Sequence, residues 1–368
     1  MAIIMNTEIL VASTRIVKQG LALLGLITCL FSCITPFQPD TVSVDPMLIV
    51  DGQITDQPGP YTIRLTRTSN YSIRSVNLLE PGATVVIADN LGNQETLKEQ
   101  SPGGVYQTSA NGLRGVPGRR YTLTIQTRAG KRYVSESEVM PAAPPIQKLY
   151  YESNYVPAVG ITRERQTWAV YLDTKDPDTL GNYYKWSWTH YEMPTACKKT
   201  FVSSGSYYTG ISCCTDCWDI TRCYTCVNIN SDVNINGKAI SRQPITDVPF
   251  TSLSRYYLEV EQQALSKNAY QFWKSVQQLT SNTGGLFDVA PSSVQGNMKC
   301  ITTPGEPVYG YFGAVGVSVS YLYVDRTEGR GAPDVDFPTS IPYPTNPSCI
   351  VCENSLYRTP NKPRFWTY

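Results

Sequence analysis

The chain has 368 residues with 31 basic and 30 acidic side chains, so its formal charge of +1 provides no basic field for holding nucleic acid. Its one histidine, His190, argues against mechanisms that need two imidazoles, including most catalytic zinc sites. The 25 tyrosines, 26 glycines and 26 prolines favour strands and turns over helices.

The N-terminal segment is typical of an export signal. Arg15 and Lys18 precede an apolar run that is shorter than the roughly 20 residues needed to span a bilayer. The run ends in Leu30-Phe31-Ser32-Cys33, which looks like a bacterial lipobox. We therefore expect residues 1–32 to be a lipoprotein signal peptide and Cys33 to be acylated. A single transmembrane helix is the alternative.

The next part of the chain predicts a tether followed by a first β domain. Residues 33–46 are polar and punctuated by prolines, which is typical of a linker. Residues 47–140 contain about seven short segments with strand-like composition, which predicts an immunoglobulin-like β-sandwich. The expected strands are 48–54, 61–67, 83–88, 94–98, 104–108, 120–127 and 132–139, with tight turns at 89–93 and 128–131.

A proline-rich stretch, 141–145, is expected to be a stiff linker to a second β-sandwich-like domain at 146–326. Its expected strands are 148–155, 166–173, 183–190, 256–264 and one or two within 308–324. One helix is expected near 267–281, with Ser266 as its N-cap. The helix residues Tyr270 and Trp273 could form a carbohydrate platform, but packing on a sheet is the favoured interpretation.

Three aspartates, Asp173, Asp176 and Asp178, lie between two of these strands. Their carboxylates could bind calcium, whose hard oxygen ligands they resemble. The glycine and the distal glutamate of an EF-hand loop are missing. The segment is therefore expected to be a solvated turn, and no metal site is predicted.

A cysteine-rich insertion, 197–226, interrupts the second domain, and a proline-rich tail, 327–368, adds two cysteines. Two Cys-x-x-Cys units lie only five residues apart, whereas zinc ribbons usually allow about 15–20. Outside the inner membrane thiols are oxidised, so disulfides are predicted in preference to zinc. The candidate disulfide residues are Cys197, Cys213, Cys214, Cys217, Cys223, Cys226, Cys349 and Cys352. Nine cysteines remain once Cys33 is acylated, so one stays unpaired, and Cys300 is the candidate.

No catalytic motif is recognisable. The chain has no Gly-x-Ser-x-Gly elbow, phosphate loop, His-Glu-x-x-His or dinucleotide fingerprint. A carboxylate pair for glycoside hydrolysis has no local spacing rule and stays open. We predict no catalytic residue and no cofactor.

Several stretches resemble a lipoprotein family of Bacteroidota that is catalogued as a domain of unknown function. They are 50–61 (Val-Asp-Gly-Gln-Ile-Thr-Asp-Gln-Pro-Gly-Pro-Tyr), Gly115-Val116-Pro117-Gly118, the Tyr270-x-x-Trp273 helix leading to Gly285-Leu286-Phe287-Asp288, Tyr309-Gly310-Tyr311-Phe312, and Cys349-x-x-Cys352 with Lys362-Pro363-Arg364-Phe365-Trp366. Members of the family tend to be encoded beside TonB-dependent outer-membrane receptors. The resemblance implies an outer-membrane lipoprotein with a role in uptake.

The expected function is that of a lipid-anchored, non-enzymatic accessory protein of a TonB-dependent uptake system. Tyr207 and Tyr208, which lie in the cysteine-rich insertion and outside the strand pattern, are the predicted contact with the receptor or its ligand. An envelope adhesion or structural module is one alternative. An extracytoplasmic hydrolase of glycans or peptides is another. The first acidic residue after Cys33 is Asp40, so the sequence does not decide between the periplasmic and the surface-exposed face of the outer membrane.

Overall fold

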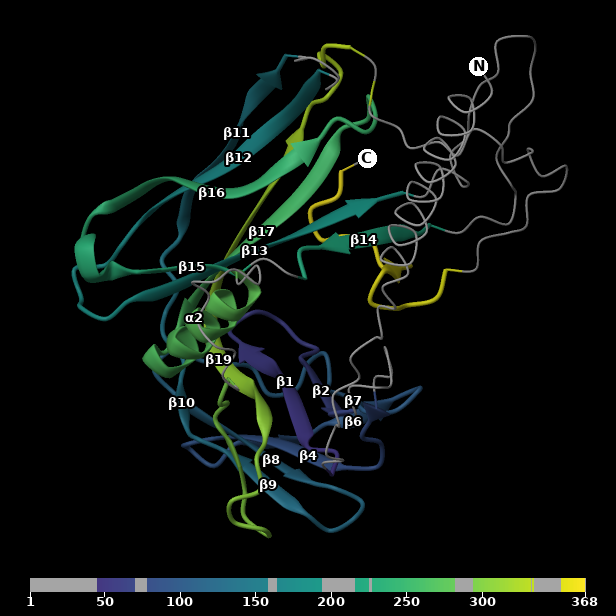
Figure 1. Cartoon of the computed structure of the whole chain (residues 1–368), viewed down its shortest axis with the longest axis vertical. Helices are drawn as coiled ribbons and strands as arrows, with labels where there is room; N and C mark the ends of the chain where they lie inside the picture. The colour runs from purple at the N-terminus through teal and green to yellow at the C-terminus, as the bar shows by residue number, and fades with distance from the viewer. Residues whose placement is uncertain are drawn as a thin grey trace, which may run out of the picture. The chain divides into compact units, whose positions relative to one another are not determined.

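The structure, a computed structural model, describes residues 45–69, 78–157, 164–193, 216–224, 227–281, 294–331, 333 and 352–367. These residues are mainly β, as expected, with one α-helix, α2 (Lys267–Ser281), and a short 3₁₀ turn, η2 (Asp232–Asn234) (Figure 1). No helix among them is long and apolar enough to cross a membrane. The predicted signal peptide and most of the tether lie outside the described residues.

The strands follow one another along the chain with the expected short connections in the first half. They are β1 (Leu48–Thr55), β2 (Thr62–Arg67), β3 (Leu78–Leu79), β4 (Thr84–Asp89), β5 (Gln94–Thr96), β6 (Lys98–Gln100), β7 (Val105–Gln107), β8 (Arg120–Gln126), β9 (Arg132–Ser135), β10 (Glu138–Val139), β11 (Ile146–Val156), β12 (Arg165–Lys175), β13 (Tyr183–Glu192), β14 (Trp218–Arg222), β15 (Asn228–Ser231), β16 (Ala239–Pro249), β17 (Tyr256–Leu265), β18 (Met298–Cys300), β19 (Tyr309–Val324) and β20 (Arg358–Thr359).

The described strands form three sheets. An eleven-stranded sheet, which we call the large sheet, has the order β20-β14-β13-β17-β19-β1-β2-β7-β6, with β15 beside β13 and β3 beside β2. A six-stranded sheet has the order β18-β9-β8-β4-β5, with β10 beside β8. A three-stranded sheet has the order β11-β12-β16.

The six-stranded sheet packs on one end of the large sheet to form a first sandwich. Alternate residues of both sheets point into the shared core, as the period of two in the sequence predicts. Its fully buried members include Val50, Leu65, Ile87, Leu123 and Phe312. Two strands of this sandwich, β18 and β19, come from beyond residue 290.

The three-stranded sheet packs on the other end of the large sheet and forms a second sandwich. Trp168, Val170 and Leu172 of β12 are buried there, as alternate residues on one face of a strand. They meet Tyr184 and Trp186 of β13, which are buried as well. The alternation of large apolar residues in these two strands therefore identifies the core side correctly.

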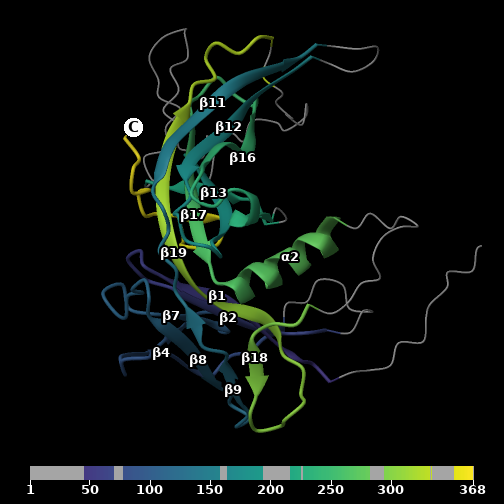
Figure 2. The ribbon, with the colours of Figure 1, turned by 90° about the vertical axis from the view of Figure 1, so that its left-hand side faces the viewer.

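One strand, β19, belongs to both sandwiches (Figure 2). Its first half pairs in parallel with β1, from Ile49↔Tyr309 to Thr55↔Val315, and its second half pairs antiparallel with β17 up to Tyr256↔Val324. Gly316 stands where the two halves meet. A Cβ atom there would lie 2.2 Å from the carbonyl oxygen of Pro141, so only glycine lets the two backbones approach this closely.

The proline-rich stretch 141–145 therefore lies against the sheets. The carbonyl of Pro144 accepts a hydrogen bond from Gln262 Nε2 (2.8 Å), and that of Pro145 accepts one from Thr174 Oγ1 (3.0 Å). The described residues from Pro46 onward belong to one compact unit. The linker composition predicts that 47–140 and 146–326 fold independently, and this stays a prediction.

Helix α2 packs on the face of the large sheet opposite the two sandwich cores. Ser266 caps it, as predicted, because its Oγ accepts a hydrogen bond from the backbone N–H of Ala269 (3.1 Å). Tyr270 stacks on Tyr183 of β13, with 4.8 Å between ring centroids, and Trp273 packs on the same cluster. The aromatic stripe of the helix is thus packing surface.

Candidate functional site: an interface at the carboxy-terminal segment

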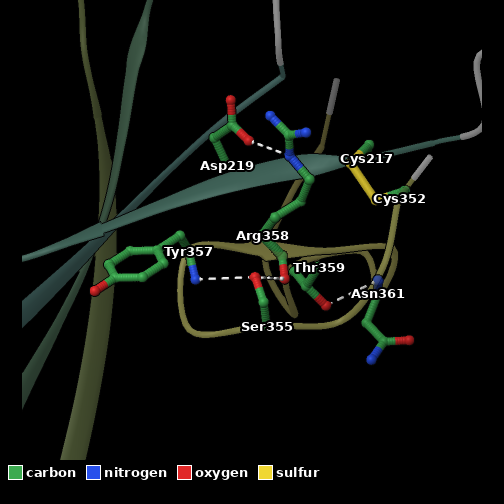
Figure 3. The surroundings of a disulfide bond; sticks show 8 residues. All are labelled: Cys217, Asp219, Cys352, Ser355, Tyr357, Arg358, Thr359 and Asn361. Atoms are coloured by element: carbon green, nitrogen blue, oxygen red, sulfur yellow. Dashed lines mark hydrogen bonds and ion pairs between the residues drawn. A yellow bond between two sulfur atoms is a disulfide. The ribbon is translucent and has the colours of Figure 1, made fainter. Parts of the chain in front are cut away.

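A disulfide attaches the described end of the chain, residues 352–367, which we call the carboxy-terminal segment, to the second sandwich (Figure 3). It joins Cys217, just before β14, to Cys352, with 5.8 Å between the Cα atoms and a sequence separation of 135. Both cysteines are among the predicted disulfide residues. The bridge therefore closes a long loop of the chain.

Backbone pairing continues the attachment from the disulfide into the large sheet. The two residues of β20 pair with β14, Thr359 opposite Trp218 and Arg358 opposite Asp219. The Arg358 Nε also lies 2.6 Å from Asp219 Oδ1, and Ile220 N–H donates to the carbonyl of Tyr357 (2.7 Å). The segment thereby becomes the edge strand of the sheet.

A tight turn shapes the segment before β20. The backbone N–H of Ser355 donates to the carbonyl of Arg358 (2.8 Å), and its side-chain oxygen accepts from the N–H of Tyr357 (3.2 Å). After β20, Thr359 Oγ1 accepts from the N–H of Asn361 (3.1 Å) (Figure 3). Serine and threonine hydroxyls commonly close turns in this way.

The end of the segment covers an aromatic area of the large sheet. Trp366 lies edge-on to Tyr257 of β17, at 5.3 Å between ring centroids, and to Trp218 of β14, at 6.2 Å. Phe365 stacks on Tyr321 of β19 at 4.5 Å with only 7° between the ring planes. Such ring pairs add stabilisation beyond the area that they bury.

A buried carboxylate lies under this aromatic cover. Glu259 of β17 accepts a hydrogen bond from Tyr257 Oη (2.6 Å), and Arg364 Nε lies 3.4 Å from its other oxygen. Burial and then the bond to Glu259 raise the pKa of Tyr257, so the phenol keeps its proton. The segment thus supplies a cation to a carboxylate that has little access to water.

One aromatic patch beside the disulfide stays in solvent. Tyr224, Leu356 and Tyr357, which we call the Tyr224–Tyr357 patch, are 62%, 40% and 64% exposed. The two tyrosine rings contact edge-on at 6.2 Å. Cys223, next to Tyr224, is disulfide-bonded, and the Tyr357 carbonyl is held by β14. The backbone on both sides of the patch is therefore fixed while the rings face water.

The structure describes some of the predicted site residues and leaves others out. Cys217 and Cys352 bind each other, Cys223 is disulfide-bonded, and Cys300, the candidate for the unpaired cysteine, is free and lies buried. The following lie outside the described residues: Cys33, Cys197, Cys213, Cys214, Cys226, Cys349, Tyr207 and Tyr208.

Tyr224 and Tyr357 are not among the residues predicted from the sequence to form a contact. Both lie beside disulfide cysteines and outside long alternating runs, the same signal that pointed to Tyr207 and Tyr208. A tyrosine near a disulfide cysteine in an irregular segment is a candidate for an exposed contact. That rule would have found the patch.

Lys185 of β13 is a second unusual group. Its Nζ lies 3.9 Å from the centroid of Trp273 on α2, and the helix and sheet enclose much of the side chain. Burial lowers its pKa to about 8, against the opposing influence of the Glu261 and Asp51 carboxylates. The contact to the indole ring is a cation–π interaction that ties helix to sheet.

A cavity of about 520 Å³ lies in the first sandwich, along the loop between β18 and β19. Met298, Cys300, Glu306 and Val308 are among the residues that line it. Glu306 is engaged, since Lys131 Nζ lies 2.7 Å from one oxygen and Tyr133 Oη donates to the other (2.8 Å). These contacts hold the loop against β9.

The groups with metal-binding or catalytic potential have structural partners. His190 is buried, donates from Nδ1 to the carbonyl of Tyr257 (2.7 Å) and stacks on Tyr256 at 3.6 Å. Asp176, expected in a solvated turn, is instead buried and accepts hydrogen bonds from Tyr184 Oη and from Gly237 N–H (3.0 Å). Among the described residues no cluster of His, Cys, Asp and Glu has the make-up of a metal site.

Comparison with known families gives one match. The model of a family described as "Domain of unknown function (DUF4249)" matches residues 34–320. A comparison with curated proteins gave no match.

Proposed function

The chain belongs to the DUF4249 family, a domain of unknown function, and on that premise we propose that it is a lipid-anchored, non-enzymatic accessory protein of a TonB-dependent outer-membrane uptake system. In this proposal Cys33 carries the lipid, and the protein binds a receptor or its ligand without transforming it.

The observation that carries the proposal is the Tyr224–Tyr357 patch. Tyrosines are enriched at protein interfaces because each buries a large area and keeps a hydroxyl for hydrogen bonding. Holding them on a backbone fixed by a disulfide lowers the entropy lost on binding. A surface with only a structural role would gain nothing from two exposed, pre-positioned rings.

The anchor fits a protein that works next to a membrane partner. The 14 residues between Cys33 and Leu48 can span at most about 50 Å when extended. A lipid at Cys33 would keep the folded part within that distance of the bilayer. Such confinement raises the effective concentration of the protein near a membrane receptor.

Four buried or half-buried carboxylates are engaged by tyrosine hydroxyls, which favours a binding role over hydrolysis. Glu138, Asp176, Glu259 and Glu306 each accept a hydrogen bond from a tyrosine hydroxyl. A glycoside hydrolase would need a carboxylate pair open to its substrate.

Co-purification tests the proposal. The tagged protein, solubilised from native membranes in mild detergent, should bring down a TonB-dependent receptor that mass spectrometry identifies. The double variant Tyr224→Ala/Tyr357→Ala should lower the receptor recovered by about tenfold, because interface tyrosines are frequent hot spots. Circular dichroism should show an unchanged fold.

A matched control removes two other exposed apolar side chains. Leu91 and Leu180 are 65% and 85% exposed and lie in the connections between β4 and β5 and between β12 and β13. Leu91→Ala/Leu180→Ala should recover as much receptor as the wild type. Absence of any receptor from the wild-type sample would favour the adhesion or hydrolase alternatives, and equal recovery with both double variants would exclude the patch as the contact.

A further inference from the structure

Strand β11 is an edge strand with an open side. It pairs with β12 without interruption from Lys148↔Asp173 to Val156↔Arg165, and no described strand pairs with its other side. All six residues from Tyr151 to Val156 are exposed. A long exposed edge presents unpaired N–H and C=O groups and is a template for another strand.

The other edge of the same sheet, β16, is protected against pairing with a further strand, whereas β11 is not. β16 carries Pro244 and Pro249, which have no N–H to donate, and its pairing with β12 shifts register at Val170/Tyr171 and at Leu172/Thr174. Prolines and bulges are common devices against edge-to-edge pairing. β11 has no proline, and its register shift lies only at its start, between Ile146 and Lys148.

The large sheet, which lies beneath β11, also has an edge on the same side that pairs with no described strand. β19 pairs with β1 only up to Val315, and the side chains of Asp56 and Gln57 bond the backbone of Val317. Beyond that point no described strand pairs with this edge of β19. β11 runs next to it, as Figure 2 shows, and Ile146 N–H donates to Ser318 Oγ (3.1 Å).

The charges on β11 are self-complementary. Lys148 and Glu152 lie on the same face, two residues on either side of Tyr150, with Lys148 Nζ 4.4 Å from the Tyr150 ring centroid. In an antiparallel pair of two β11 strands centred on Tyr150, each Lys148 lies directly opposite a Glu152. Centring the pair on Lys148 or on Glu152 would oppose like charges.

We propose that β11 pairs antiparallel with β11 of a second copy, in the register centred on Tyr150, to form a two-fold symmetric dimer. The three-stranded sheets of the two copies then become one six-stranded sheet. Two Lys148–Glu152 pairs select this register, because opposite charges directly across an antiparallel pair attract and like charges repel. Glu152 also pairs with Arg242 of its own chain, at 2.5 Å, and its second oxygen is left for the partner's lysine.

Charge reversal tests the dimer on the full-length chain in detergent, with mass measured by sedimentation over a wide range of concentration. The wild type should be dimeric at high concentration. Lys148→Glu places glutamates opposite each other twice and should weaken dimerisation by about tenfold or more. The swap Lys148→Glu/Glu152→Lys restores both pairs and should return the dissociation constant to near its wild-type value.

Lys274→Glu is the matched control, since Lys274 is an exposed lysine of α2, away from β11, and the variant has the same net charge as Lys148→Glu. It should dimerise like the wild type. A wild type that stays monomeric at every concentration would overturn the proposal. So would a dimer that Lys148→Glu leaves intact, or one that the charge swap fails to restore.

Discussion

Tyrosine hydroxyls that bond buried carboxylates are the recurrent side-chain arrangement of this protein. Tyr311 bonds Glu138 (2.6 Å), Tyr257 bonds Glu259, Tyr133 bonds Glu306 and Tyr184 bonds Asp176. Burial, followed by these bonds, raises the pKa of each of the four tyrosines, so each keeps the proton that it donates. A chain with 25 tyrosines and one histidine thus stabilises its inner carboxylates mostly with neutral donors.

The Glu138 pair is the most central and gives the first prediction at this scale. Glu138 of β10 is only 2% exposed and accepts hydrogen bonds from Ser266, the cap of α2, and from Asn297 as well as from Tyr311 of β19. Tyr311→Phe removes one donor from a buried carboxylate. The free energy of unfolding in urea should fall by about 1–3 kcal/mol.

Tyr183→Phe is the control for that measurement, because Tyr183 stacks on Tyr270 and its hydroxyl makes no hydrogen bond with the described residues. It should change stability by less than about 0.5 kcal/mol, as surface-like substitutions do. A Tyr311→Phe protein as stable as the control would mean that the hydrogen bond from Tyr311 to Glu138 does not contribute to the free energy of unfolding.

At the scale of elements, local pattern predicts most of the structure. The alternation of apolar and polar residues predicted the positions of β2, β12 and β13. The Ser266 cap and the helical spacing of apolar residues predicted the bounds of α2 almost to the residue. β16 was missed because its two prolines are atypical of a strand, although an edge strand tolerates them. β20 was missed because two residues, Arg358 and Thr359, become a strand only when β14 pairs with them.

The carboxy-terminal segment depends on its disulfide, and Cys352→Ser tests this. A cross-link between residues this far apart stabilises by roughly 2–5 kcal/mol, mainly by restricting the unfolded chain. Beyond the bond, the described contacts of the segment are the short β20, one turn, the ion pairs of Arg358 and Arg364, and the packing and hydrogen bonds of its last residues. We expect faster tryptic cleavage at Arg358 and Arg364, with a loss of unfolding free energy within that range.

Cys217→Ser and the double variant control for effects of the serine itself. Because both cysteines act through one bond, the double variant should be no less stable than either single variant. Additive losses would show that the cysteines contribute separately. Unchanged proteolysis in all three would show that the other contacts hold the segment without the disulfide.

For the molecule as a whole, the large sheet is the feature that the sequence could not predict. The parallel pairing of β1 with β19 joins residues 49–55 to 309–315, and the sequence of neither strand indicates which strand it pairs with. Similarly, the proline-rich stretch 141–145 has the composition of a linker, yet it packs at Gly316. In the candidate interface, the participation of Cys217 and Cys352 in disulfides was predictable from the sequence. Their pairing with each other was not, since connectivity depends on the fold.

The shared sheet changes the expectation for residues 47–140 expressed alone. The linker composition predicted an independently folding sandwich. That fragment lacks β19, which pairs with β1, and β18, which pairs with β9. It also loses Met298, Val308 and Phe312 from its core, and each such side chain contributes about 1.5–3 kcal/mol when buried. Their sum is comparable with the total stability of a typical domain, about 5–15 kcal/mol.

We therefore expect the 47–140 fragment to show no cooperative thermal transition by circular dichroism. The same fragment joined through a flexible linker to residues 294–324 regains β18, β19 and the missing core residues, and it should melt cooperatively. A linked control in which Phe312 is replaced by Asp should not, because the charge would be buried in the first sandwich. Cooperative melting of 47–140 alone would show that the first sandwich closes without β19 and that the two halves are separate folding units.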